Sequence, residues 1–257
     1  MTAGAAWSSN AALAAGVWGA GKLLRRPGRR VQRAKKAWLR GLDEDDDRKK
    51  EAEKPDSVLF GNMTEWGPQA KRYILSEHGL GAEGQWNAVG FAEHHLASQD
   101  LHKLRAAMGI AGFRTCALAA ERSGRSASGT HGGVCVSVGK RFAATVVGPD
   151  AKHQDGSKLW GDGWATVVLH RAGLDVAYTC AYFECAGGKL TPTITRKAKE
   201  IRTCHGELGI PWILAADFNA TPEEIKKSGL LAILGGQVMV PEGVEFTCTA
   251  GHKQMLD

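Results

Sequence analysis

The sharpest chemical feature of this sequence is a carboxylate and a carboxamide placed two residues apart at the end of an apolar run. The segment 212–216 (WILAA) leads directly into Asp217, and Asn219 follows after one residue. The apolar run predicts a buried strand, and alternation at its end would point Asp217 and Asn219 to the same side. Positions where a strand passes into a loop commonly hold binding and catalytic residues.

Two earlier strand-like runs end in the same manner. Glu93 follows the run 89–92 (VGFA), and Asn62 follows the run 58–61 (VLFG). Hard oxygen ligands at several strand ends suit Mg²⁺, which takes one or two protein carboxylates and keeps water molecules for a phosphate substrate. A single Asp or Asn after a strand is most often a turn residue, so the prediction of a metal site depends on the three runs together.

The segments that must position these residues are short apolar runs and amphipathic helices. Strands are predicted at residues 58–60, 88–92, 113–118, 134–138, 143–147, 165–170, 175–183 and 212–215. Helices are predicted at 68–78, 99–108 and 193–208, and another helix begins at the capping box of residues 221–224 (TPEE). Consecutive strands in the middle, with strand–helix alternation at both ends, favour an α+β fold. We expect two mixed β-sheets packed as a sandwich flanked by helices, a four-layer α/β/β/α arrangement.

The net charge of the chain lies before the predicted folded part. Residues 1–55 contain 13 Lys and Arg against 7 Asp and Glu, whereas the whole chain contains 33 against 27, so the net charge of +6 belongs to this segment. An Ala-rich stretch, a basic block at 22–40 and an acidic run at 43–47 follow one another there. Such blocks bury too little apolar area to offset chain entropy. Residues 1–56 are therefore predicted to be a disordered tail, and residues 57–257 a single domain.

The basic block at 22–40 has three open interpretations. It could contact the phosphate backbone of nucleic acid or serve as a nuclear address, it could be part of an organelle transit peptide, or it could be a flexible arm without a specific partner. The six cysteines lack C-x-x-C spacing and several lie in apolar runs, which favours a reducing compartment and argues against structural zinc. No run approaches the roughly 18 apolar residues of a membrane span, so no membrane partner is expected. The predicted location is intracellular, with the nucleus favoured over an organelle.

Taken in order, the motifs resemble those of the endonuclease/exonuclease/phosphatase superfamily, which includes apurinic endonucleases, deoxyribonuclease I-like enzymes and the endonuclease domains of LINE-type retrotransposons. The matching markers are Asn62 in GNMTEW, Glu93 in GFAEHHL, the His131-Gly-Gly-Val strand, Tyr182 in CAYFECAGG, Asp217 and Asn219 in AADFNATPEE, and Asp257 in QMLD. The resemblance covers residues 57–257, and AADFN departs from the family pattern G-D-x-N in having Ala216 in place of glycine. It implies a two-layered β-sandwich flanked by helices, with Mg²⁺ at the strand ends.

The resemblance also implies a role for each matched residue. Glu93 would be the principal ligand of Mg²⁺, or of Mn²⁺ as an alternative ion, with Asn62 beside it. Asp217 would orient or deprotonate the attacking water, and Asn219 would hydrogen-bond the phosphate and Asp217. Tyr182 would contact the phosphate as charge develops, with Tyr178 taking that role if the alignment is shifted by two residues.

Asp257 resembles the family aspartate that holds a catalytic histidine. In the family that histidine lies further downstream, so the sequence predicts a chain that is incomplete at its C-terminus and lacks the histidine and at least one core strand. His131 and His252 do not match the histidine's motif.

The expected function is Mg²⁺-dependent phosphodiester hydrolysis by a nucleic-acid endonuclease, with DNA as its partner and a mobile element as one origin. The alternatives are a phosphomonoesterase or lipid phosphodiesterase of the same superfamily, or a catalytically inactive remnant that binds nucleic acid. The predicted domain carries equal numbers of acidic and basic residues. The basic tail would therefore have to supply the positive charge for tight duplex binding.

Overall fold

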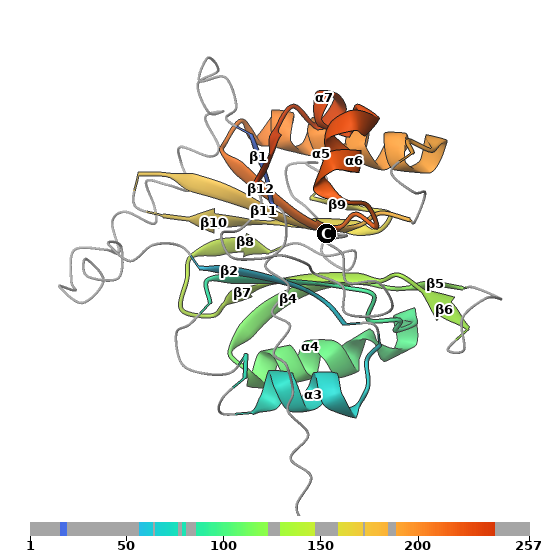
Figure 1. Cartoon of the computed structure of the whole chain (residues 1–257). Helices are drawn as coiled ribbons and strands as arrows, with labels where there is room; N and C mark the ends of the chain where they lie inside the picture. Colours follow the sequence, from blue (N-terminus) through green and yellow to red (C-terminus); the bar gives the residue numbers. More distant parts are fainter. Residues whose placement is uncertain are drawn as a thin grey trace, which may run out of the picture.

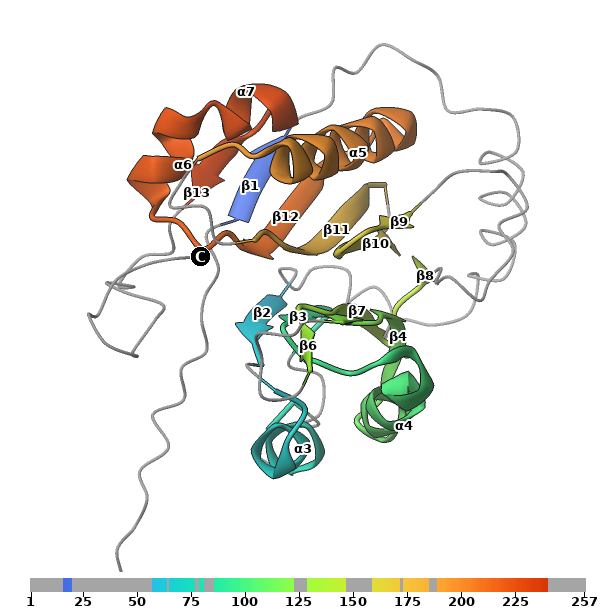
Figure 2. The same cartoon turned by 90° about the vertical axis from the view of Figure 1, so that its right-hand side faces the viewer.

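The chain forms two β-sheets that face each other, with helices on both outer sides (Figures 1 and 2). The computed structural model describes residues 57–63, 65–76, 79–80, 86–122, 129–146, 159–171, 173–184 and 189–239, together with the backbone of 16–19. Among these residues, no helix has both the length and the apolar character that crossing a membrane requires.

The first sheet, within the described residues, has seven strands. They are β1 (Gly16–Gly19), β8 (Ala144–Val146), β9 (Trp160–Gly161), β10 (Trp164–His170), β11 (Asp175–Tyr182), β12 (Trp212–Asp217) and β13 (Gln237–Met239). Their order across the sheet is β13-β1-β12-β11-β10-β8, and β9 also pairs with β10. The neighbours β11 and β12 run parallel, whereas the other pairs are antiparallel. The sheet is therefore mixed, as the sequence predicts.

The second sheet contains β2 (Val58–Asn62), β3 (Ala88–Ala92), β4 (Phe113–Leu118) and β7 (Val134–Gly139) in the order β2-β3-β7-β4. The pair β2–β3 is parallel, and β7 is antiparallel to both of its neighbours. A short hairpin of β5 (Glu121–Arg122) and β6 (Thr130–His131) extends from one end of this sheet.

Helices cover the outer face of each sheet. The second sheet is covered by α3 (Pro68–Leu75) and α4 (Leu101–Ile110), which follows the 3₁₀ turn η1 (Ser98–Asp100). The first sheet is covered by α5 (Pro192–Leu208), α6 (Pro222–Ser228) and α7 (Leu230–Leu234). The ends of α5 follow from local chemistry: the Thr191 hydroxyl accepts a hydrogen bond from the Ile194 amide, and Gly209 adopts φ 61° beyond the last turn.

Three apolar clusters correspond to the three interfaces of this four-layer arrangement. One lies between α3, α4 and the second sheet, with Leu104 and Met108 fully buried. One lies between the two sheets, and the third lies between the first sheet and α5–α7. Because alternate residues of a strand point to opposite faces, each central strand contributes to two clusters. This two-faced burial explains why the strands are predominantly apolar along their whole length.

The predicted fold class, an α+β sandwich of two mixed sheets flanked by helices, is confirmed. Each strand and helix predicted from the sequence has a counterpart whose ends differ by at most three residues. One segment departs from expectation, because Gly16–Gly19 lies within the predicted disordered tail and nevertheless forms β1. The division into a tail and a domain otherwise stays a prediction, since the rest of residues 1–56 lies outside the described part.

Candidate active site

Three of the predicted site residues end strands and project into the space between the sheets. Asn62, Tyr182 and Asp217 are the last residues of β2, β11 and β12. The residue two positions earlier on each strand belongs to the inter-sheet cluster, and residues two apart on a strand share a face. The parallel pairing of β11 with β12 puts Tyr182 opposite Asp217. The carboxyl ends of strands from both sheets therefore meet at one edge of the sandwich.

The side-chain amide of Asn62 joins the two sheets at this edge. Its Nδ2 donates to Oε2 of Glu93 at 2.7 Å and to Oδ2 of Asp217 at 2.7 Å. Glu93 follows a strand of the second sheet, whereas Asp217 ends a strand of the first. Two carboxylates from different sheets therefore share one donor, and Asp217 is only 3% exposed.

Glu93 reaches the site because the backbone turns at that residue. Simple alternation along β3 would point Glu93 toward the helices, on the side of Val89 and Phe91, which pack in the helix-facing cluster. Instead Glu93 adopts φ 55°, in the left-handed region that non-glycine residues rarely occupy. Backbone strain of this kind persists only where the surrounding structure enforces it.

The loop after β3 is held in place by backbone hydrogen bonds and by the buried imidazole of His94. The backbone carbonyl of His94 accepts a hydrogen bond from the Trp66 amide at 3.0 Å, and Nδ1 of the His94 ring accepts one from the Leu96 amide at 3.1 Å. Burial lowers the pKa of His94 to about 4, so the ring is neutral at physiological pH and can act as this acceptor. A Cβ atom on Gly133, at φ 86°, would lie 2.5 Å from the ring. Glycine is therefore required there.

Tyr182 places its hydroxyl beside the two carboxylates. Burial raises the pKa of Tyr182 well above its ordinary value, and the negative charges of Glu93 and Asp217 add to this shift, as does a hydrogen bond with Glu93. The phenol therefore keeps its proton and remains a donor at neutral pH. The neighbouring Gly132 packs against the ring, because a Cβ there would lie 3.2 Å from Cδ1 of Tyr182.

A buried lysine on α5 fixes the backbone at the end of β11. Nζ of Lys197 donates to the carbonyl oxygen of Tyr182 at 2.7 Å and lies 6.0 Å from the centre of the Tyr182 ring and 5.8 Å from that of Phe183. Lys197 is only 4% exposed, and burial lowers its pKa. Lys197 was not predicted as a site residue, although the helical spacing of the sequence places it on the apolar face of α5.

Asn219 connects the two strand ends through its backbone amide and its side chain. Its backbone amide donates to Oδ1 of Asp217 at 3.1 Å, and its Nδ2 donates to the carbonyl oxygen of Phe183 at 3.0 Å. The residue adopts φ 47°, and the capping box of Thr221 and Glu224 starts α6 immediately afterwards. In this arrangement Asn219 orients Asp217, whereas its predicted contact with phosphate stays a prediction.

Tyr178, the alternative to Tyr182, is fully buried between the sheets, and its hydroxyl donates to the Leu59 carbonyl at 2.7 Å. Asp257 and His252 lie outside the described residues.

A second polar cluster borders the site beyond Tyr182. Nε2 of His131 lies 3.8 Å from Oε2 of Glu121, and a hydrogen bond with Asp162 raises the pKa of Glu121. Asp162 in turn accepts from Arg196 at 2.8 Å. This cluster joins the β5–β6 hairpin to the turn after β9 and to α5, and it was not foreseen from the sequence.

The donor set at the strand ends consists of carboxylate and amide groups. Among the described residues, no group of three or more His, Cys, Asp and Glu side chains could hold a metal ion. Mg²⁺ is held by one or two carboxylates and completes its octahedron with water and substrate oxygens. Glu93 and Asp217, linked through the Asn62 amide, supply that number of carboxylates.

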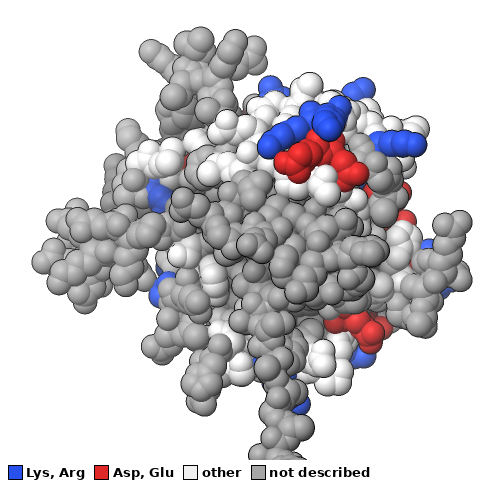
Figure 3. All heavy atoms as spheres, in the orientation of Figure 1, with Lys and Arg blue, Asp and Glu red and all other residues white. Residues whose placement is uncertain are grey.

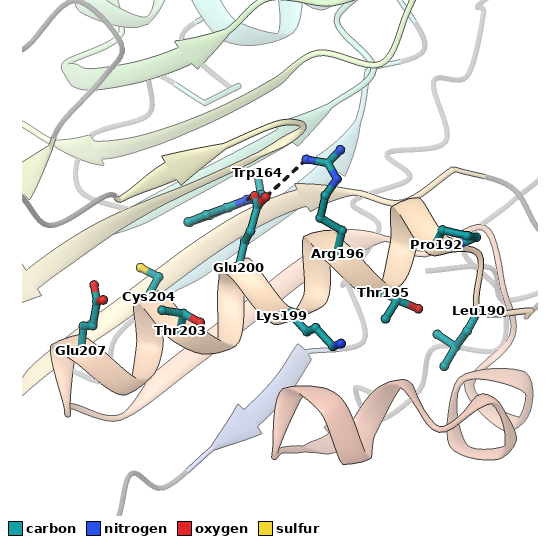
Figure 4. A pocket seen from close by; sticks show the side chains of 10 residues that line it. All are labelled: Trp164, Leu190, Pro192, Thr195, Arg196, Lys199, Glu200, Thr203, Cys204 and Glu207. Carbon is teal, nitrogen blue, oxygen red and sulfur yellow. Dashed lines mark hydrogen bonds and ion pairs between the residues drawn. The ribbon is translucent and has the colours of Figure 1, made fainter.

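A separate groove of about 840 Å³ runs along α5 (Figure 4). Glu200 lies at its middle, where it accepts hydrogen bonds from Trp164 Nε1 at 3.2 Å and from Arg196 at 3.3 Å. None of the residues predicted for the site lines this groove. On the face shown in Figure 3, the described acidic and basic side chains lie next to one another over the α5–α7 layer and form no single basic surface.

Among known proteins, the comparisons give matches only to solved structures. No protein-family profile and no curated protein matches the sequence. Among solved structures, the endonuclease domain of TRAS1, a telomere-specific non-LTR retrotransposon, is 14% identical with a TM-score of 0.49, and the match covers 79% of this chain and 83% of that one. Sphingomyelinase C from Streptomyces griseocarneus is 16% identical with a TM-score of 0.48, and the match covers 79% of this chain and 82% of that one. An endonuclease/exonuclease/phosphatase family protein from Bacteroides thetaiotaomicron is 13% identical with a TM-score of 0.44, covering 69% and 68%. The solved structures similar to this chain thus include a member of the superfamily that its motifs resemble.

Proposed function

We propose that this chain is a divalent-metal-dependent phosphodiester hydrolase that acts on nucleic acid as an endonuclease. The observation that carries the proposal is the double hydrogen bond of the Asn62 amide to Glu93 and Asp217. This contact supports a single reaction centre built from strand ends of both sheets. A purely structural set of turn residues would not need carboxylates from two sheets to share one amide donor.

Glu93 is proposed as the principal ligand of Mg²⁺, or of Mn²⁺, with Asn62 beside it. The ion, when bound, would polarise a phosphate oxygen and stabilise the charge that develops during cleavage. Asp217, buried and held by hydrogen bonds from Asn62 and Asn219, is proposed to orient the attacking water and to accept its proton.

Tyr182 is proposed to donate a hydrogen bond to a phosphate oxygen. Its raised pKa keeps the hydroxyl protonated at neutral pH, which is the state that can donate. Donors that are already aimed at the place where charge develops contribute strongly to catalysis, because they need no reorganisation during the reaction. Lys197 would act through Tyr182 by fixing the backbone to which the ring is attached.

The substrate is proposed to be DNA, with the basic block at 22–40 contacting the phosphate backbone. The balanced charge of the predicted domain supports a division of labour in which the domain cuts and the block binds. Deleting residues 22–40 should weaken DNA association and flatten its salt dependence, because fewer counterions are then released. Unchanged affinity and an unchanged salt slope would contradict this role for the block.

The chain is further proposed to act inside the cell, with the nucleus as the favoured compartment. Asn62 and Asn219 both begin formal N-x-[ST] acceptors, and both touch Asp217. A bulky glycan on either one would block the site. Peptide mass spectrometry of the native protein should therefore find both asparagines unmodified, and a glycan on either would refute the location and that residue's role.

A plasmid-nicking assay tests the proposed activity. Supercoiled plasmid is incubated with the chain in Mg²⁺, in Mn²⁺ and in chelator, and the relaxed form is quantified over time. Cleavage should require the metal and should fall by at least about 10²-fold in Glu93→Gln, which keeps the shape of the side chain and removes its charge. The matched control is Glu223→Gln, an exposed glutamate on α6 that should leave the rate unchanged.

The alternative functions give different outcomes in the same experiment. Hydrolysis of a phosphomonoester or of sphingomyelin in preference to plasmid would indicate the other phosphoesterase classes. Binding of DNA without metal-dependent cleavage of any of these substrates would indicate a catalytically inactive chain. Full activity of Glu93→Gln would show that the proposed centre is wrong.

A further inference from the structure

One strand of the first sheet, β1, is far from all the others in the sequence. β1 (Gly16–Gly19) is separated from the next described residue, Ser57, by the 37 residues 20–56. It is not an edge strand, because it pairs with β12 on one side and with β13 on the other. Figures 1 and 2 both show it inside the sheet beneath α5–α7.

The pairing of β1 is antiparallel and continuous on both sides. Against β12, the register runs from Gly16 opposite Ala215 to Gly19 opposite Trp212. Against β13, it runs from Gly16 opposite Met239 to Trp18 opposite Gln237. The described part of β13 has no other strand partner and so is connected to the sheet only through β1.

We propose that β12 and β13 form a strand-accepting slot, and that the N-terminal segment Gly16–Gly19 of the same chain is the strand that fills it. Recognition in such a slot depends mainly on backbone hydrogen bonds, in the manner of β-strand addition. The segment suits this role because it lies in an uncharged stretch and places Val and Trp, which favour strands, between two glycines.

The need for an occupant follows from the burial of β12. Four of the last five residues of this strand are at most 4% exposed and the fifth, Ile213, packs against the inter-sheet cluster. With the slot empty, the backbone groups of β12 that face β1 would lose their partners. An unpaired buried backbone group is costly because it has lost its hydrogen bonds to water, so an unfilled slot would expose or distort this edge.

The slot matters for the site because β12 ends at Asp217. Gly16 pairs with Ala215, two residues before that carboxylate. Filling the slot should therefore keep the end of β12 in the place where Asp217 meets Asn62. This role of β1 in the sheet does not depend on the proposed catalytic activity.

The long connection allows an intramolecular strand to compete well with other strands. The 37 residues of 20–56 can span up to about 120 Å when extended, so the segment can reach the slot from any side of the domain. Tethering on this scale gives an effective concentration of roughly millimolar order. A foreign peptide or a second copy would have to exceed that concentration to displace it.

Hydrogen–deuterium exchange on the full chain tests the proposal. Val17→Pro removes a backbone donor from the middle of β1 and should make the amides of 212–217 and 237–239 exchange at least about tenfold faster. Val17→Thr, which keeps the amide and a β-branched side chain, is the matched control and should leave this protection unchanged. Equal protection in Val17→Pro and wild type would overturn the proposal.

A second measurement uses a peptide in place of the tethered strand. A synthetic peptide of residues 12–23, added at millimolar concentration, should restore protection of 212–217 in the Val17→Pro chain, whereas the same peptide with proline at position 17 should not. No restoration by the unmodified peptide would count against a slot that recognises this segment. Protection of the wild-type chain that is lost on dilution would mean that a second copy supplies the strand, and would also overturn the proposal.

Discussion

Asn62 and Asp217 are 155 residues apart in the chain, lie in different sheets, and are joined by a 2.7 Å hydrogen bond. The same Asn62 nitrogen also donates to Glu93. Without this shared donor, the carboxylates of Glu93 and Asp217 would face each other across the edge of the sandwich with no positive partial charge between them. The amide group therefore offsets repulsion between them and fixes their spacing.

Replacing Asn62 with alanine should disable the site. Loss of the shared donor should lower the free energy of unfolding by about 1–3 kcal/mol, because the buried Asp217 loses a partner, and should reduce phosphodiester cleavage by about 10²-fold. Urea denaturation and plasmid nicking measure the two effects. Asn87→Ala is the control, because Asn87 is buried at the opposite end of β3, where it accepts a hydrogen bond from the Ser57 amide. This variant should be less stable than wild type but should show no specific loss of cleavage activity.

The tyrosines should not ionise near pH 10 while the chain is folded. The sequence has three, and burial raises the pKa of Tyr73, Tyr178 and Tyr182 alike. In the unfolded chain they would lose their protons near pH 10. The three tyrosines therefore contribute their full stabilisation below about pH 10. This stabilisation is lost as the pH rises from about 10 through the pKa values of the tyrosines in the folded state. Phenolate absorbance should appear together with loss of native circular dichroism, and an ordinary titration near pH 10 in the native state would contradict the burial of the site.

Buried neutral histidines should make the fold sensitive to acid. Burial lowers the pKa of His94 to about 4 and that of His205 to about 3. Groups with depressed folded pKa values contribute stability above their unfolded pKa near 6.5, and this is lost as the pH falls toward the folded values. The free energy of unfolding should therefore decrease between pH 6.5 and 4, by on the order of 3 kcal/mol for His94. Denaturation curves across this range test it.

Lys197 should influence catalysis through Tyr182. Lys197→Met keeps most of the buried side-chain volume and removes the hydrogen bond to the Tyr182 carbonyl, so the ring should become less well fixed. We expect cleavage to fall by about tenfold, mainly in kcat, as is usual for small displacements of positioned groups. Lys199→Met, on the groove side of the same helix, is the matched control. If both variants cleave equally fast, Lys197 serves only the packing of α5.

The parts of this site that the sequence predicts are those specified by local pattern. An apolar run with a polar residue at its end identifies Asn62 and Asp217, because alternation carries their direction from the buried residues before them. Tyr182 is identified only through the resemblance of its motif. Glu93 was found by its position after a run, but its orientation depends on φ 55° and on a loop held by distant partners. Local pattern cannot supply that information.

The roles of Lys197 and β1 could not be predicted from the sequence, for two different reasons. Lys197 lies between Ile194 and Ile201 on the buried face of α5, so its unusual position is visible in the helical spacing, although its partner is not. β1 has only four residues and pairs with strands about 200 positions later. Nothing in a segment of that length distinguishes an inserted strand from an uncharged tail.

The separation between Asn62 and Asp217 also bears on how the chain folds. Closing a loop of 155 residues costs entropy before any contact across it is formed, and sheets dominated by such distant pairings fold in milliseconds to seconds. Trp212 and His205, by contrast, are close in sequence and stack at 4.4 Å between β12 and α5. The stacking of Trp212 on His205 should therefore form early in refolding, while the two carboxylates come together only when the two halves of the sandwich associate.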